Sequence, residues 1–110
     1  MASLQRQLSG SFHEIRSKIY RGILDGSISS ELNGSHDFTG RNSRCSVMVF
    51  ERYSAFGGNR VSLSVTLYQE GNGPVQLSAI ASGGSQAIFA KINTLSEEAF
   101  LDKLREVVDN

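Results

Sequence analysis

Charged and aromatic side chains gather around the glycine pair at positions 57 and 58, and they are the first candidates for chemistry. They are Glu51, Arg52, Tyr53, Phe56 and Arg60. Two guanidinium groups could hold a carboxylate or a phosphate through paired hydrogen bonds. A phenol and a phenyl ring could form the apolar wall of a small-molecule site. The simpler interpretation is a hairpin tip with surface ion pairs.

A second candidate is the segment Ser82-Gly83-Gly84-Ser85-Gln86, whose glycines could present backbone amides to an anion. The segment lacks the GxxxxGK[ST] pattern of a phosphate-binding loop. A glycine pair is also typical of a tight hairpin turn, which explains the segment without a ligand. Gln86 stays a candidate ligand-binding residue.

The other reactive side chains predict neither a catalytic site nor a metal centre. His13, His36 and Cys45 have no recognised metal-ligand spacing. His36 precedes Asp37, but sequence neighbours do not orient each other as an acid–base pair must. We expect Cys45 to be a buried, unreactive thiol. No metal, cofactor or catalytic residue is therefore expected.

The first candidate must be positioned by a long β-hairpin, predicted over residues 44–69. Its second strand alternates cleanly, with Val61, Leu63, Val65 and Leu67 on one face. Its first strand is apolar on both faces, so two registers stay open. A three-residue turn pairs Tyr53 with Leu63 and brings Glu51 to the core side. A two-residue turn pairs Phe50 with Val65 and Met48 with Leu67, and brings Arg52 to the core side.

The strands that follow can be aligned through their turns. A Gly71-Asn72-Gly73 loop pairs Leu67 with Leu77 and Val65 with Ala79. A Gly83-Gly84 turn would then pair Leu77 with Ala90 and make residues 85–92 a strand. Both turns leave the same face apolar. The alternative for residues 85–92 is the start of a helix.

Two helices and two weaker strands complete the expected elements. Ser11 and Glu14 form a capping box before an apolar stripe that ends near Gly26, with Arg16 on the solvent side. Thr94 and Glu97 form a second capping box before the last helix. Residues 4–8 predict a short edge strand and residues 27–33 another strand. Residues 34–44 are polar and predict a loop or an irregular edge.

This order predicts one α+β domain over residues 1–110: strand, helix, four or five antiparallel strands, helix. A curved sheet with both helices on one face would bury both apolar stripes. The arrangement resembles a helix-grip or TBP-like topology, and a ferredoxin-like sheet is the alternative. Five apolar residues would then lie on the uncovered sheet face, which favours a homodimer through that face unless a bulge turns some inward. They are Met48, Phe50, Tyr68, Ile80 and Phe89.

The stretches ERYSAFGGNRVSLSVTL, SGGSQAIFAKINT and EEAFLDKL resemble an uncharacterised family of small bacterial proteins, a domain of unknown function. The resemblance covers nearly the whole chain. It implies a bacterial, cytosolic protein and supplies no activity, ligand or catalytic residue.

Composition narrows the function classes. Eleven basic and eleven acidic residues balance, which argues against nucleic acid and anionic membranes as partners. A single cysteine and the absence of a signal-like or membrane-spanning run predict a cytoplasmic protein. We therefore expect a non-catalytic binding or homo-oligomeric interaction module. The alternative is a carrier or small enzyme with a pocket between the sheet and the C-terminal helix for an acidic or amphipathic small molecule.

Overall fold

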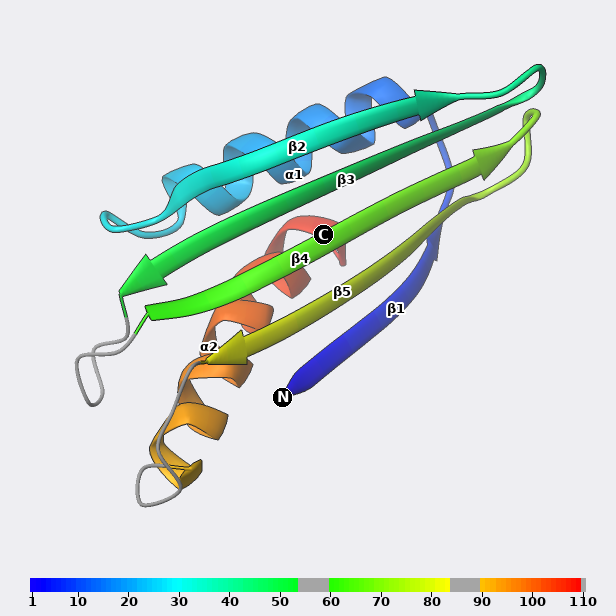
Figure 1. Ribbon diagram of the computed structural model, residues 1–110. Helices are drawn as coiled ribbons and strands as arrows, with labels where there is room; N and C mark the ends of the chain where they lie inside the picture. The colour runs from blue at the N-terminus through cyan, green and yellow to red at the C-terminus, as the bar shows by residue number, and fades with distance from the viewer. Residues whose placement is uncertain (54–59, 84–89, 110) are drawn as a thin grey trace.

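The computed structural model describes residues 1–53, 60–83 and 90–109, which form five strands and two helices (Figure 1). The sheet is antiparallel and its strand order is β1-β5-β4-β3-β2. Both helices lie on the same face of the sheet. In chain order the elements are β1 (Ala2–Leu8), α1 (Phe12–Asp25), β2 (Glu31–Thr39), β3 (Ser43–Tyr53), β4 (Arg60–Glu70), β5 (Val75–Gly83) and α2 (Ala90–Val108).

This order confirms the predicted α+β arrangement of strand, helix, four antiparallel strands and helix. The ferredoxin-like alternative is wrong, because that fold places its second helix before its last strand. Here α2 follows the last strand. The first strand reaches the sheet edge by pairing with the last one, Leu4 opposite Ala79.

Helix α1 begins as its capping box predicts. Ser11 is the N-cap, and its Oγ accepts a hydrogen bond of 3.3 Å from the backbone N–H of Glu14. Ile19 and Ile23 carry the apolar stripe into the core, where both are buried. The prediction of this helix is confirmed.

The start of α2 differs from the prediction. The helix begins at Ala90, so Thr94 lies inside it and not at its N-terminus. Residues 90–92 are helical, so the strand predicted over 85–92 is wrong for them, while residues 85–89 lie outside the described part. The edge of β5 that was assigned to this strand is occupied by β1. Alternating apolar residues of β1, such as Ala2 and Leu4, complete the same inner face.

The two hairpins that contain β4 show how far register can be read from sequence. The β4–β5 register is confirmed: Leu67 pairs with Leu77 and Val65 with Ala79. The β3–β4 register matches neither alternative, because Phe50 pairs with Leu63. The described pairing ends at Tyr53 and Arg60, and residues 54–59 lie outside the described part.

This register decides which side chains of β3 face the helices. Successive residues of a strand point to opposite faces, so Met48, Phe50 and Arg52 share the inner face with Val61 and Leu63 of β4. Met48 and Phe50 are fully buried in the core. Their predicted place on the uncovered face is therefore wrong, and no bulge in the β3–β4 ladder is needed to turn them inward.

Strand β2 is an edge strand with little apolar alternation in its sequence. It runs over Glu31–Thr39, with a register shift between Leu32 and Gly34. The predicted strand over 27–33 starts too early. For residues 34–39 the predicted loop is wrong, and the alternative of an irregular edge is confirmed. Most of its side chains are exposed, so no apolar alternation marks it.

Candidate functional site

Arg52 occupies the inner face of the sheet near the end of β3, opposite Val61. Its Nη1 donates a hydrogen bond of 2.7 Å to Ser27 Oγ, and its Cζ lies 4.7 Å from the centroid of the Phe100 ring. The side chain is half-buried. Burial lowers the pKa of Arg52, because a low-dielectric environment disfavours the charged form. Arg52 still carries its charge at neutral pH.

Three separate segments meet at this guanidinium. Ser27 belongs to the connection that follows α1, Arg52 to the end of β3, and Phe100 to the buried face of α2. The ring holds the guanidinium through a cation–π contact, and the hydroxyl fixes one of its N–H donors. The arrangement presents a positioned cation between the sheet and the C-terminal helix.

Arg60 and Tyr53 lie on the opposite, outer face of the sheet, where they form a cross-strand pair. The Arg60 Cζ lies 5.3 Å from the centroid of the Tyr53 ring. The sequence suggested that Arg52 and Arg60 hold one anion together. They cannot do so from the same side, because they lie on opposite faces of the sheet. Phe56 and Gln86 lie outside the described residues, so ligand binding by them stays a prediction.

Arg60 is engaged by carboxylates of the protein itself. It forms ion pairs with Glu31 and with Glu51, the latter through Nε at 3.3 Å. Glu31 and Glu51 face each other across β2 and β3. Like charges directly opposite in a sheet repel, so Arg60 bridges a pair that would otherwise destabilise the edge. We assign Arg60 a structural role.

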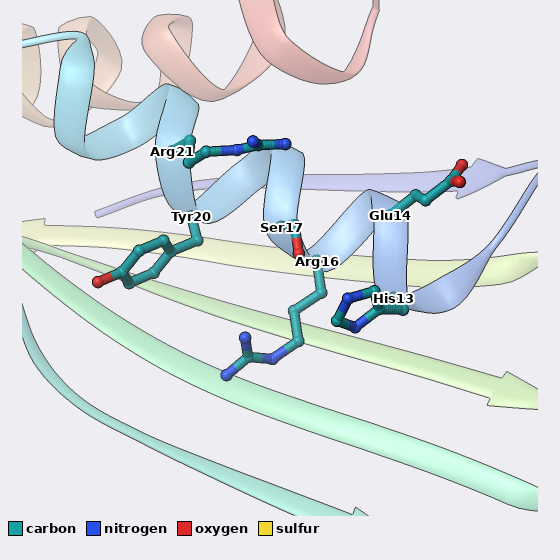
Figure 2. A pocket seen from close by; sticks show the side chains of 6 residues that line it. All are labelled: His13, Glu14, Arg16, Ser17, Tyr20 and Arg21. Carbon is teal, nitrogen blue, oxygen red and sulfur yellow. The ribbon is translucent and has the colours of Figure 1, made fainter.

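A hollow of about 450 Å³ lies along α1, lined by His13, Glu14, Arg16, Ser17, Tyr20 and Arg21. Figure 2 shows Arg16 and Tyr20 extending from the helix toward the green strands. Arg16 was expected on the solvent side, and this is wrong. Its Nε hydrogen-bonds to Ser46 Oγ at 2.9 Å and to Asp37 Oδ1 at 3.2 Å.

Arg16, Ser46 and Asp37 form a polar contact that joins α1 to β3 and β2. Ser46 is fully buried on the inner face. A hydrogen bond from Ser46 lowers the pKa of Asp37 most, and the charge of Arg16 lowers it further. The three side chains bond to one another, so we infer that their role is to dock α1 against the sheet. Sequence reasoning missed the contact, because its three members lie on three different elements.

No helix of the described residues covers the outer face of the sheet (Figure 1). Tyr68 and Ile80 lie there, 37% and 43% exposed, as the sequence predicts, and Phe38 and Tyr53 join them. Cys45 is half-buried on this face beside Tyr68, so it is less enclosed than expected. Phe89 lies outside the described residues.

Within the described part of the chain no group of three potential ligands could hold a metal ion. No helix there is long and apolar enough to cross a membrane.

Comparison with known proteins gives a family for this fold. The family of unknown function DUF6054 matches residues 1–110. The chain belongs to this family. The expected resemblance to an uncharacterised domain is confirmed at that level. No curated protein and no solved structure matches the chain, so DUF6054 membership brings no activity with it.

Proposed function

We propose that this DUF6054 protein is a non-catalytic interaction module that acts as a homodimer through the outer face of its sheet. One observation carries the proposal: among the described residues, the centre of that face holds no charged side chain, although 20% of the chain is charged. Charged residues are depleted at the core of protein interfaces. A face that only water covers has no reason to exclude them.

The sheet register defines this central region. One row across β3, β4, β5 and β1 consists of Val49, Ser64, Ile80 and Ser3, and the neighbouring row of Val47, Thr66, Ser78 and Gln5. Charged residues on this face lie toward its ends. Glu31, Glu51 and Arg60 are at one end and Glu70 at the other. Aromatic side chains lie nearby, with Tyr68 on β4 and Phe38 on β2.

The size of the face fits a stable dimer. Strands of 7 to 11 residues spaced about 4.8 Å apart, at about 3.3 Å per residue, give roughly 700 Å². A standard interface buries roughly 800 Å² per partner. A two-fold axis through the face would bring the same region of both copies together.

Sedimentation equilibrium tests the proposal. Ile80→Glu and Ser64→Glu each place two like charges in the centre of a two-fold interface. We expect each to raise the dissociation constant of the dimer by about 100-fold or more. Ile28→Glu is the matched control, because Ile28 is fully exposed in the connection between α1 and β2. A wild-type monomer at high concentration, or dimers that tolerate both sheet variants, would contradict the proposal.

A second function is favoured by the position of Arg52. A carrier for a small acidic or amphipathic molecule would need a cation between the sheet and the C-terminal helix, and Arg52 lies against Phe100 there.

For cellular location we propose the bacterial cytoplasm, which the lone cysteine supports.

A further inference from the structure

Arg52 has no carboxylate partner among the described residues. The chain contains eleven acidic residues, and none of them falls in the segments 54–59, 84–89 and 110 that lie outside the described part. Among the ion pairs of the described residues, none includes Arg52. Burial alone accounts for the lowered pKa of Arg52, with no opposing carboxylate.

Other arginines of the protein show what is usual here. Arg6 pairs with Asp109, Arg16 with Asp37, and Arg105 with Asp102 and Glu98. These three side chains are only partly exposed, and each has a carboxylate partner. Arg21, Arg41 and Arg44 have no ion pair among the described residues either, but they are exposed, where a missing partner matters little. Arg52 is therefore the partly buried arginine that lacks a counter-ion there, although an unpaired charge is costly to bury.

The local contacts leave this charge incompletely compensated. A guanidinium carries five N–H donors, and the described residues supply one acceptor, Ser27 Oγ. The Phe100 ring adds a cation–π attraction but no acceptor. The same connection holds Ser30, whose Oγ is buried without a partner among the described residues. Its backbone N–H donates to the carbonyl of Ser27.

We propose that Arg52 binds the oxyanion group of a small ligand, a carboxylate or a phosphate, at the end of the sheet between β3 and α2. The planar fork of the guanidinium matches two oxygens of such a group through parallel hydrogen bonds. Phe100 and Ser27 hold the fork in place before the ligand arrives, which lowers the entropy lost on binding. The inference rests on the second proposed function, a carrier for an acidic molecule. Arg52 lies on the inner face, so this site is independent of the proposed dimer.

Nuclear magnetic resonance of the arginine side chains tests the site directly. The Nε–Hε signal of Arg52 is assigned by its loss in Arg52→Lys, and the ¹⁵N-labelled protein is titrated with sodium benzoate, inorganic phosphate and the uncharged benzamide. We expect a saturable shift of the Arg52 signal with an oxyanion at about millimolar concentration, and none with benzamide. A response to benzoate alone identifies a carboxylate ligand, and a response to phosphate identifies a phosphate ligand.

Variants separate a specific site from general charge. Arg41→Gln removes an exposed arginine in the turn between β2 and β3, at the other end of the sheet, and should keep the Arg52 response. Arg52→Gln should abolish stabilisation of the protein by the responding anion in thermal unfolding. The proposal is overturned if neither oxyanion moves the Arg52 signal, if all arginine signals move together, or if benzamide acts equally. Because the titration uses wild-type protein, a poorly folding variant does not prevent the test.

Discussion

Arg60 offers a sharp test of how this sheet edge is held, because one cation bridges two opposed carboxylates. Glu31 and Glu51 are cross-strand neighbours on β2 and β3, and Arg60 on β4 pairs with both. With Arg60 present, each carboxylate is favourable. With Arg60→Gln, the two carboxylates only repel each other. We therefore expect Glu51→Gln to destabilise the wild-type protein and to stabilise the Arg60→Gln variant.

The structure sets the size of this effect. Glu31 and Arg60 side chains are 56% and 42% exposed, so each ion pair contributes roughly 0.2–1 kcal/mol. Opposed like charges cost a similar amount in a sheet. Arg60→Gln should then lower the free energy of unfolding by about 1–2 kcal/mol. The coupling between Arg60 and Glu51 should be about 1 kcal/mol.

Urea unfolding of the four proteins of this double-mutant cycle, followed by circular dichroism, measures the coupling. Salt at about 1 M shortens the Debye length to about 3 Å and should weaken the coupling. Arg41→Gln, an exposed arginine away from the pair, serves as the control. If Glu51→Gln has the same sign in both backgrounds, the bridging role is refuted, and Arg60 again becomes a candidate for binding an external anion.

Two further predictions concern the docking of α1. A Cβ at Gly22 would lie 2.4 Å from Val107 Cγ2 of α2, so Gly22→Ala should cost about 1–3 kcal/mol of unfolding free energy. In a Val107→Ala background the same change should be neutral or stabilising, since alanine favours helix, and an equal loss in both backgrounds would argue against this close approach. The second prediction concerns Asp37, whose pKa is lowered in the folded protein by Ser46 and Arg16. The carboxylate therefore contributes stability above its unfolded pKa of about 3.9, which is lost as pH falls through the lowered folded pKa. Asp37→Asn should flatten that acid-side decline in urea unfolding, and an unchanged decline would exclude the contact as its source.

Local patterns predicted the elements whose signals agree with one another. Ser11 and Glu14 mark the start of α1 because a capping box satisfies backbone donors within the same segment. The β4–β5 register followed from the alternation of both strands and a short glycine loop, because this alignment places Leu67, Val65, Leu77 and Ala79 on one face. These elements needed no information from distant parts of the chain.

Local patterns identified the residues of the candidate site but not the sheet face on which each of them lies. Arg52, Tyr53 and Arg60 were recognised as unusual residue types near one turn. Their separation onto two faces depends on the β3–β4 register, and a shift of one residue exchanges the faces. In β3 both faces are apolar, with Val47 and Val49 opposite in direction to Met48 and Phe50. The apolar pattern of β3 therefore could not determine its register against β4.

The sequence by itself determined the order of strands and helices, the capped start of α1 and the alignment of β4 with β5. Tertiary structure decided that β1 rather than residues 85–92 pairs with β5, because two segments with similar alternation competed for one edge. It also decided that Arg52 faces the helices with no carboxylate partner among the described residues, while Arg60 faces outward with two. Which partner a side chain meets depends on segments far away in sequence, and local spacing carries no record of them.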